Sequence, residues 1–423
     1  MNIPMNVAFF VDDFPSITQT FVLRQIAGVM AQGWPVVIYA HRDNGLSGAH
    51  RLFDEFNMTA RTIYLPPLPR SRTQRLIALV KVCSKPETMR HLFKLARSLN
   101  FFRYGGEAAS LRLFLRSIPF LNSGPFDILH SQFGWLGAAA CRLRQIGVLT
   151  GKVVTSFRGY DTEQYLKQKP DAYRHLFRNG DLFLPVCDYF KTWLIANGCP
   201  EDKIEVLRSG IDLKEFAFRV RKLGDPGTVR LLSVARMREK KGLRYALQAV
   251  AMLRRAGRDV HYTILGDGPQ RDDLLSLAGE LGIGQYVSMP GAKPHKEVVA
   301  IMERSDILLA PSITASDGDH EGIPNVLKEA MATGMPVIGT YHSGIPELVI
   351  DQKTGFLVPE KDAEAIEHRV TALLDHPEAG AKMGKAGRAM VEREYDIDRL
   401  NRRLIELYRG LYLKQECRES TTS

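Results

Sequence analysis

The sequence lacks several features that define common functional classes. It contains no apolar run of about 18 residues, so no membrane-spanning helix is expected. Its five cysteines, at positions 83, 141, 187, 199 and 417, include no Cys-x-x-Cys pair, which argues against a zinc cage and a disulfide framework. The start of the chain lacks the basic segment and cleavage site of a secretory signal peptide. These absences predict a protein of the reducing cytoplasm.

Acidic residues are scarce in one part of the chain. Residues 61–120 contain twelve basic side chains and two acidic ones, so this block carries 12 − 2 = +10, which equals the net charge of all 423 residues. Within it, 68–120 is predicted to form amphipathic helices with apolar and basic positions. Such a surface is typical of proteins that bind an anionic membrane or nucleic acid. The alternative is a solvated helix face without a partner.

Apolar strands alternate with helical segments along most of the chain. In the first half, strands are expected at 5–11, 34–40, 127–130, 152–157, 181–186 and 204–207. In the second half, strands are expected at 229–235, 261–266, 287–290, 307–310, 336–340 and 355–358. This alternation predicts an α/β protein with two Rossmann-like domains, each a doubly wound parallel sheet, that face each other across a cleft.

The predicted organisation is two domains joined by a connector. Residues 1–212 would form the first domain, and 213–228, which contains Pro226-Gly227, would be the linker. Residues 229–385 would form the second domain. A charged helix at 386–414 is expected to pack back toward the first domain, and 415–423 is expected to be disordered.

The stretch 318–349 combines a predicted helix start with two carboxylates. Pro324 suits the first position of a helix, and Glu321 precedes that helix while Glu329 lies inside it. Free backbone N–H groups and the positive end of a helix dipole suit a phosphate or a sugar hydroxyl. The candidate loop is Gly322, Ile323, Pro324 and Asn325. All of these except the proline have a backbone N–H to offer. Two glutamates alone would equally fit an ordinary surface helix.

Two other turns are predicted at the same edge of the second sheet. Arg236 and Lys241 follow the strand 229–235, where two cations and free N–H groups suit a diphosphate. Gly266 and Gly268 follow the next strand and permit positive φ and the close approach of a ligand. The alternative for the two cations is an exposed turn without a ligand.

Polar residues also end the strands of the first domain. No Gly-x-Gly-x-x-Gly follows the first strand, so a dinucleotide site is not expected. His130 ends one strand, and Arg158 and Asp161 follow another. Such ends converge at one edge of an open α/β sheet and can build a site there. A single histidine at a strand end can equally be structural.

The motifs of the second domain resemble those of the retaining glycosyltransferases of family 4, which have the GT-B fold. The motifs that carry this resemblance lie at 235–242, 265–269, 321–332, 342–349 and 354–359. In the first domain, 14–15, 18–21, 127–130 and 157–161 resemble the colanic-acid and exopolysaccharide branch of that family. The resemblance extends over roughly residues 5–400, and it is most specific in the second domain.

The resemblance implies roles for individual residues. Arg236 and Lys241 match the positions that bind the diphosphate of a nucleotide sugar, Glu329 the position that holds the ribose, and Glu321 the one that contacts the transferred sugar. The loop around sugar and phosphate matches 322–325, with Gly266 and Gly268 beside it, and Thr18 lies in a turn that closes on the donor. His130, Arg158 and Asp161 would lie on the acceptor side. The nucleoside diphosphate sugar is then a substrate, and no cofactor or metal is implied.

The first domain departs from the family pattern at three positions. Arg158 stands where the family usually has a histidine, Gln132 where it often has a histidine, and Gln19 where it has a glutamate. Arginine cannot act as a base at neutral pH. It can instead neutralise a leaving phosphate or an anionic acceptor. In the mechanism usually drawn for the family, the leaving diphosphate takes the acceptor's proton, so the loss of a histidine is compatible with activity.

The sequence therefore predicts a metal-independent, retaining glycosyltransferase of the hexosyltransferase type. Its acceptor would be a lipid-linked or growing polysaccharide, of the exopolysaccharide, capsule or lipopolysaccharide type, at the inner face of the cell membrane. The block 61–120 would bind anionic lipid, and no nucleic acid is expected. Two alternatives remain: a nucleotide-sugar 2-epimerase on the same fold, and a non-catalytic protein that binds acidic glycan or nucleic acid.

Overall fold

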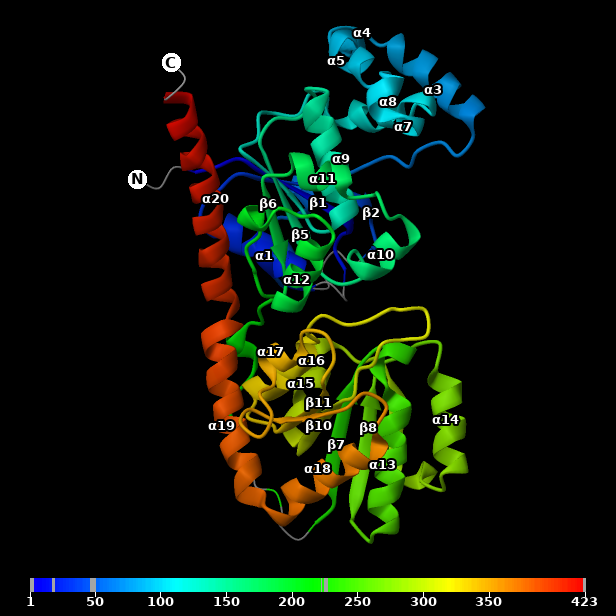
Figure 1. Cartoon of the computed structure of the whole chain (residues 1–423), viewed down its shortest axis with the longest axis vertical. Coiled ribbons are helices and arrows are strands. Elements are labelled where there is room, and N and C mark those ends of the chain that lie inside the picture. Colours follow the sequence, from blue (N-terminus) through cyan, green and yellow to red (C-terminus); the bar gives the residue numbers. More distant parts are fainter. Residues whose placement is uncertain (1–3, 17–19, 46–50, 222, 224–226, 421–423) are drawn as a thin grey trace. The chain divides into compact units, whose positions relative to one another are not determined.

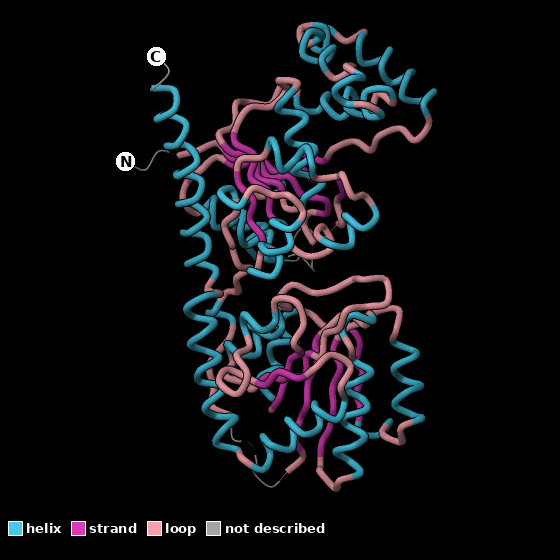
Figure 2. The backbone as a smooth tube through the Cα atoms, in the orientation of Figure 1, coloured by secondary structure: helices cyan, strands magenta, loops and turns pink. Residues whose placement is uncertain are grey.

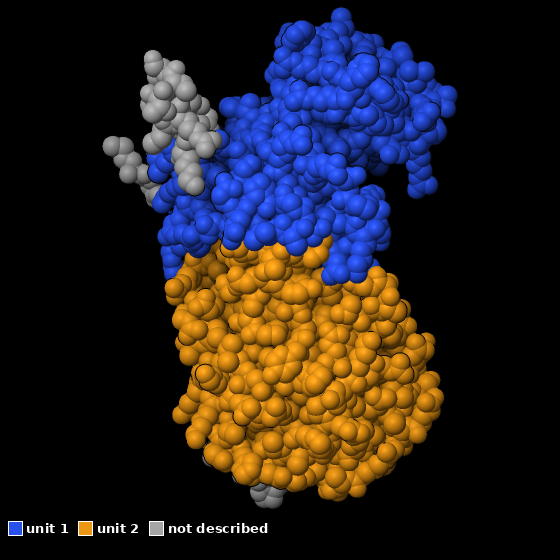
Figure 3. Space-filling view, viewed as in Figure 1, with its two compact units in different colours: residues 1–185, 194–205, 401–423 blue, residues 186–193, 206–400 orange. Residues whose placement is uncertain are grey.

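The chain folds into two compact units, which Figure 3 shows in separate colours. The structure is a computed structural model that describes residues 4–420 except 17–19, 46–50, 222 and 224–226. Unit 1 comprises residues 1–185, 194–205 and 401–423, and unit 2 comprises 186–193 and 206–400. Helices α12 (Asp188–Ala196) and α20 (Ile397–Ser420) therefore contribute residues to both units.

Unit 1 is built on a parallel sheet of six strands (Figures 1 and 2). The sheet has the order β3-β2-β1-β4-β5-β6, and its topological switch point lies between β1 and β4. Its strands are β1 (Val7–Asp13), β2 (Val36–Arg42), β3 (Thr62–Tyr64), β4 (Ile128–Ser131), β5 (Lys152–Phe157) and β6 (Leu182–Pro185). The first five residues of β1 are all buried, which requires both faces of the sheet to be covered. Covering helices include α1 (Thr20–Met30), α9 (Gly134–Gln145) and α11 (Arg174–Asn179).

Six short helices between β3 and β4 form a separate cluster in unit 1 (Figure 1). They are α3 (Arg72–Cys83), α4 (Pro86–Met89), α5 (Leu92–Arg97), α6 (Phe101–Tyr104), α7 (Gly106–Ala109) and α8 (Arg112–Ser117). Leu95, Phe114 and Leu115 form the small core of this cluster. The helical prediction for 68–120 is confirmed, but the helices are short. Pro86 starts a new helix, and Gly105, with φ +49°, ends another.

Unit 2 repeats the topology of unit 1. Its six parallel strands have the order β12-β11-β10-β7-β8-β9, so the switch point lies between β7 and β10. They are β7 (Val229–Val234), β8 (Val260–Leu265), β9 (Val287–Gly291), β10 (Ile307–Ala310), β11 (Val337–Thr340) and β12 (Phe356–Val358). The helices include α13 (Leu243–Arg255), α14 (Arg271–Glu280), α15 (His295–Arg304), α16 (Asn325–Ala332), α17 (Ile345–Leu348) and α18 (Ala363–Asp375). The predicted fold class, two Rossmann-like parallel-sheet domains, is confirmed.

Two details of the predicted strands are wrong. The sequence 204–207 is not a strand, since only Ile204 forms an isolated bridge, with Phe183. The adjacent strand β6 has only four residues. It ends at Pro185, which has no N–H and so cannot donate a further hydrogen bond to a neighbouring strand. Conversely, the short edge strand β3 (Thr62–Tyr64) was not expected.

The segment expected to be a linker is packed into unit 2. Phe216 is buried there, and Arg221 is buried with its guanidinium bonded to carbonyl oxygens of Ser305 (3.1 Å) and Met302 (3.2 Å). After an earlier passage into unit 2 at residues 186–193, the chain leaves unit 1 for unit 2 between residues 205 and 206 instead. A buried arginine whose donors reach carbonyls ties this segment to the unit.

The C-terminal region consists of two helices where the sequence suggested one. Helix α19 (Pro377–Glu394) ends before Tyr395, and α20 begins at Ile397. The break allows Ile211 to pair with the backbone of Tyr395 (2.9 Å) and Ile397 (3.1 Å). Residues 415–420, expected to be disordered, continue α20. Residues 421–423 lie outside the described part of the chain.

A buried histidine joins the end of the chain to the sheet of unit 1. Both ring nitrogens of His130 on β4 are hydrogen-bonded. Nδ1 lies 2.5 Å from Oη of Tyr408 on α20, and Nε2 lies 2.8 Å from Oγ of Ser156 on β5. Its side chain is completely buried. Burial, with a contribution from the Arg158 cation, holds the pKa of His130 well below its ordinary value. The imidazole is therefore neutral and structural in this arrangement.

We expect Tyr408→Phe to lower the free energy of unfolding by about 1–3 kcal/mol, because it leaves a buried ring nitrogen of His130 without a partner. Urea denaturation followed by tryptophan fluorescence checks this, since Trp34 lies 6.1 Å from the Tyr408 ring. Tyr412→Phe, a half-buried tyrosine of the same helix, is the matched control. Equal effects of the two substitutions would contradict the role of His130.

Candidate functional site

Five loops of unit 2 meet at the carboxyl edge of its sheet. The loop 235–242 follows β7 and the loop 311–324 follows β10, so these two flank the switch point. The other three loops follow β8, β11 and β12. In open α/β sheets, ligands bind at this edge and at this point of the strand order. The site is therefore located by topology before any side chain is considered.

Three glycines allow the loops at this edge to press against each other. A Cβ at Gly242, whose φ is +61°, would lie 1.9 Å from the carbonyl oxygen of Pro311. A Cβ at Gly266 would lie 2.0 Å from the oxygen of Ala235. One at Gly268 would lie 2.6 Å from the oxygen of Met237. The positive φ expected at Gly266 and Gly268 is present, but the close neighbour is the chain's own loop 235–237.

Glu321 lies between two lysines. Its carboxylate is 3.0 Å from Nζ of Lys241 and 3.2 Å from Nζ of Lys240, which also contacts Asp319 at 3.0 Å. All four side chains are at least four-fifths buried. Burial alone would raise the pKa of Glu321, but Lys241 and Lys240 outweigh it and lower the pKa to about 2. The structure thus brings together two of the predicted residues, Glu321 and Lys241, and keeps the carboxylate ionised.

A histidine and a second carboxylate support Glu321 from behind. The backbone N–H of Glu321 donates to Nε2 of His342 at 3.1 Å, and Nδ1 of His342 lies 2.5 Å from Glu360. This pattern fixes the tautomer, with the proton on Nδ1 and the lone pair on Nε2 facing the amide. His342 is 2% exposed, and burial lowers its pKa although Glu360 acts in the opposite direction. Glu360 also accepts the N–H of Thr314, so it holds the loop at two points.

The start of α16 follows directly after Glu321. Pro324 is the cap residue rather than the first helical residue, and α16 begins at Asn325. The side chain of Asn325 accepts from the buried Lys328, at 2.8 Å, and Lys328 also donates to the carbonyl of Ser209 at 2.7 Å. Glu329 lies one turn after Asn325 and is partly buried. Gly322, beside Ile323, packs against Phe190. A Cβ at Gly322 would lie only 3.0 Å from the ring of Phe190.

Arg236 is exposed at the tip of the loop after β7. Its neighbour Met237 is fully buried and anchors the loop. The carbonyl of Arg236 accepts the N–H of Arg238 at 2.8 Å, but among the described residues its side chain makes no hydrogen bond or ion pair, in contrast to those of Lys240 and Lys241. A guanidinium group without an internal partner, on a backbone that is held in place, can bind an anionic ligand without first breaking an internal contact.

Arg158 in unit 1 belongs to a network with two glutamines. Its Nε donates to Oε1 of Gln132 at 3.1 Å, and its Nη2 donates to Oε1 of Gln25 at 3.1 Å and to Gln132 at 2.5 Å. The ring of Phe21 lies 4.5 Å from the guanidinium. Burial lowers the pKa of Arg158 to about 10, so it remains a cation at neutral pH. Two of the three positions that depart from the family pattern, Arg158 and Gln132, are thus bonded to each other.

The other predicted acceptor-side residues have structural partners. Asp161 accepts backbone N–H groups of Arg158 (2.9 Å), Gly159 (3.0 Å) and Gly134 (3.0 Å), and burial raises its pKa to about 6. Both ring nitrogens of His130 are occupied in the core, so no nitrogen is left for a ligand. The acceptor-side roles of Asp161 and His130 stay predictions that this geometry does not support. Thr18 lies outside the described residues.

Comparison with known proteins decides the family. The profile of Glycosyltransferase Family 4 matches residues 18–215, and that of Glycosyl transferases group 1 matches 216–390. The protein named as the colanic acid biosynthesis glycosyltransferase WcaL of Escherichia coli strain K12 is 39% identical over 96% of this chain and 100% of its own. The chain belongs to glycosyltransferase family 4. The amylovoran biosynthesis glycosyltransferase AmsK of Erwinia amylovora is 37% identical over 96% of this chain and all of its own length.

Solved structures confirm the fold of this glycosyltransferase. HepE of Anabaena, in complex with UDP, superposes with a TM-score of 0.71 at 15% identity and covers 96% of this chain and 100% of its own. WaaG, a glycosyltransferase involved in lipopolysaccharide biosynthesis, gives 0.62 at 17% identity and covers 96% and 100%. The predicted GT-B fold and the predicted family are both confirmed.

Sequence reasoning missed part of this site. Lys240, Asp319, His342 and Glu360 were not singled out, although Lys240 shares Glu321 with Lys241. Their positions in the sequence could have identified them, because each of the four residues follows a strand at the same edge of the sheet. Among the described residues, no group of three or more His, Cys, Asp or Glu side chains could hold a metal ion.

We expect His342→Gln to keep donor binding and to change the pH dependence of stability. The lowered pKa of His342 means that the unfolded chain binds this proton more readily, so the folded protein loses stability as the pH falls below about 6.5. Protonation would also remove the lone pair that accepts the Glu321 N–H. Thermal unfolding between pH 7 and 5 checks this against the wild type. A parallel decline of both proteins would contradict it, and His368→Gln, an exposed histidine, is the control.

Proposed function

We propose that this family 4 glycosyltransferase is a retaining enzyme of exopolysaccharide biosynthesis. It transfers a sugar from a nucleoside diphosphate sugar to a lipid-linked or growing polysaccharide acceptor, and needs no divalent metal. The observation that carries the proposal is the ionised Glu321 between Lys240 and Lys241, with the exposed Arg236 on the same loop as the two lysines. The exopolysaccharide assignment is supported by the named pathways of the relatives WcaL and AmsK.

The charges at the edge of unit 2 suit the cleavage of a sugar–diphosphate bond. As the bond between C1 of the sugar and the diphosphate oxygen breaks, positive charge develops on the sugar and negative charge on the leaving group. Arg236 and Lys241 would stabilise the leaving diphosphate, and the carboxylate of Glu321 would face the sugar. Fixed charges of this kind act as preorganised electrostatic stabilisation, a role that a metal ion plays elsewhere.

The proton of the acceptor hydroxyl needs a destination. In a retaining transfer the new bond forms on the face that the diphosphate leaves, so a diphosphate oxygen lies near that hydroxyl and can take the proton. Arg158 cannot take it, because the guanidinium remains charged at neutral pH. The network of Arg158 with Gln25 and Gln132 instead supplies positive charge on the acceptor side. Glu329 would hold the ribose hydroxyls of the donor.

The helical cluster α3–α8 offers a surface for an anionic membrane. Basic and large apolar side chains are exposed together on it, among them Arg72, Leu76, Ile77, Val80, Lys81, Lys85, Arg90, Phe93, Lys94 and Phe102. Apolar side chains can enter the headgroup region while each nearby cation contributes about 1 kcal/mol. No helix among the described residues has the length and apolarity to cross a bilayer. We therefore propose peripheral binding at the inner face of the cell membrane.

The donor site is tested with nucleoside diphosphates. A ligand at about 100 times its dissociation constant adds about 2.7 kcal/mol of stability, so UDP or GDP should raise the thermal midpoint of the wild type. We expect the double variant Arg236→Ala, Lys241→Ala to lose this stabilisation and its turnover. Lys296→Ala, an exposed cation on α15, is the matched control. Retained turnover in the double variant would refute the donor site.

Product analysis of the same reactions separates the candidate enzymes. A transferase in EDTA should release free nucleoside diphosphate and an elongated glycan whose new linkage keeps the anomeric configuration of the donor. An epimerised donor formed without acceptor would identify the 2-epimerase instead. Binding of glycan without any turnover would favour the non-catalytic alternative.

Membrane binding is tested with vesicles that contain anionic lipid. We expect the substitution of five cations by glutamine to weaken binding and to make it less dependent on salt, because fewer charges contact the bilayer. The five are Arg72, Lys81, Lys85, Arg90 and Lys94, all exposed. The matched control replaces five exposed cations of unit 2, namely Arg244, Arg255, Lys296, Lys353 and Lys385. Unchanged vesicle sedimentation in the first variant would contradict membrane docking.

A further inference from the structure

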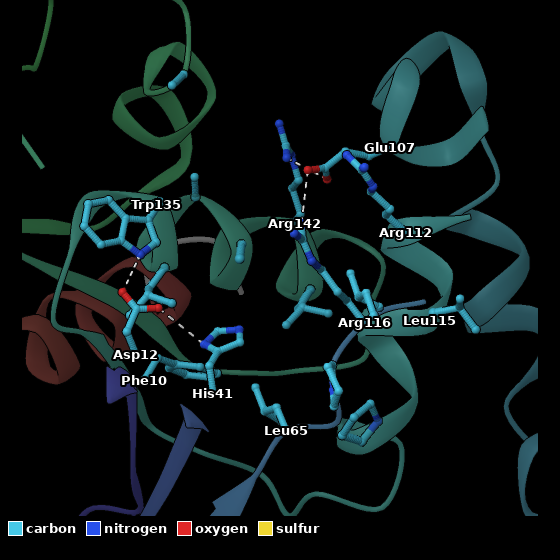
Figure 4. A pocket seen from close by; sticks show the side chains of 18 of the residues that line it. Phe10, Asp12, His41, Leu65, Glu107, Arg112, Leu115, Arg116, Trp135 and Arg142 are labelled. Carbon is cyan, nitrogen blue, oxygen red and sulfur yellow. Dashed lines mark hydrogen bonds and ion pairs between the residues drawn. The ribbon is translucent and has the colours of Figure 1, made fainter. Parts of the chain in front are cut away.

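A large cavity lies within unit 1, between the carboxyl edge of the sheet and the helical cluster α3–α8 (Figure 4). Its volume is about 1620 Å³. Most of its lining is apolar, with walls formed by Leu65, Pro66, Ala78, Val82, Leu115 and Phe120. A space of this size with mainly apolar walls can hold part of a large amphiphilic ligand.

Three arginines gather around one carboxylate on one side of this cavity. Glu107 of α7 lies 2.6 Å from Arg142 of α9 and 3.2 Å from Arg116 of α8, and Arg112 lines the same side. Figure 4 shows these side chains together. Glu107 thus acts as an internal counter-ion for a site with more positive than negative charge.

The other side of the cavity has a different chemistry. There, Nε1 of Trp135 donates to Asp12 at 2.7 Å, and the other oxygen of Asp12 lies 3.5 Å from His41 (Figure 4). Tyr160 also lines this side, and its ring packs edge-on against Trp135 at 6.2 Å. The exposed ring of Tyr160 beside the partly exposed Trp135 and a carboxylate provides stacking surface and hydrogen-bond acceptors for a polar hydroxylated group.

Helix α3 separates the cavity from the proposed membrane surface. Ala78 and Val82 of α3 line the cavity, whereas Leu76, Ile77 and Val80 of the same helix are exposed. A hydrocarbon chain that leaves the cavity past α3 would therefore meet apolar side chains on both faces of one helix. This continuity is what an occupant with a long apolar tail requires.

We propose that this cavity binds the phosphorylated end of the acceptor, a phosphate or diphosphate ester of a long hydrocarbon alcohol that carries the sugar to be extended. Arg112, Arg116 and Arg142 bind the phosphate in place of the Glu107 carboxylate, and the apolar wall takes the first part of the hydrocarbon chain. The attached sugar reaches Trp135 and Asp12. The inference rests on the proposed function, because it names the class of acceptor.

Calorimetric titration of the full chain with farnesyl diphosphate tests the site. We expect Glu107→Gln to bind this probe about tenfold more tightly, because the internal counter-ion no longer competes for the arginines. Arg112→Gln and Arg116→Gln should each bind it about tenfold more weakly. Arg51→Gln, an exposed cation of unit 1 that lies outside the helical cluster and does not line the cavity, should leave the affinity unchanged. Inorganic diphosphate and farnesol should each bind more weakly than the complete probe.

Several outcomes would overturn the inference. Equal or weaker binding by Glu107→Gln would mean that this carboxylate does not occupy an anion site, and the two arginine variants decide the matter if that variant fails to fold. Equal binding of inorganic diphosphate would remove the role of the apolar wall. Loss of probe binding in Arg236→Ala, or its displacement by saturating UDP and GDP, would place the probe at the donor site. If UDP and GDP fail to bind at all, the proposed function fails, whatever the probe does.

Discussion

The proposed donor site depends on one electrostatic arrangement, a buried carboxylate that two lysines keep ionised. Glu321 would be expensive to bury alone, and Lys240 and Lys241 would repel each other without it. Each group therefore needs the others, and all three need the glycine-packed loops that bring them to one edge of the sheet. His342 and Glu360 extend this dependence to two further strands, because they hold the backbone of Glu321 in place. The site is thus a property of the whole sheet edge rather than of one motif.

The two units use the same strand order for different chemistry. In unit 2, the edge of the sheet gathers the charged side chains of Lys240, Lys241, Asp319 and Glu321, which would suit a nucleoside diphosphate. In unit 1, the corresponding polar residues are largely engaged with each other, as in the network of Arg158 with Gln25 and Gln132. The space for a ligand in unit 1 is bounded instead by the inserted cluster α3–α8. An insertion of helices has therefore given one copy of a repeated fold a cavity of its own.

Local sequence was enough to predict the alternating strands and helices, because buried parallel strands are apolar throughout and glycines mark the sharp turns. It also located Arg236, Lys241 and Glu321 on loops of one sheet edge. It could not predict that Glu360 would reach His342, since these residues come together only through the order of β11 and β12. His130 illustrates the opposite problem: a polar residue at a strand end looked available to a ligand, yet Tyr408 from the far end of the chain covers it. The segment 204–207 had strand-like residues but lacked a neighbouring strand long enough to pair with.

The contact of His130 with Tyr408 has a consequence for synthesis on the ribosome. All six strands of unit 1 have been made by residue 185, but the tyrosine that completes the bonding of its central histidine is residue 408. The core of unit 1 is therefore complete only after the whole of unit 2, which ends at residue 400, has been translated. During that interval the nascent sheet has a polar gap where α20 will lie, and a chain released before its last helix leaves the gap open.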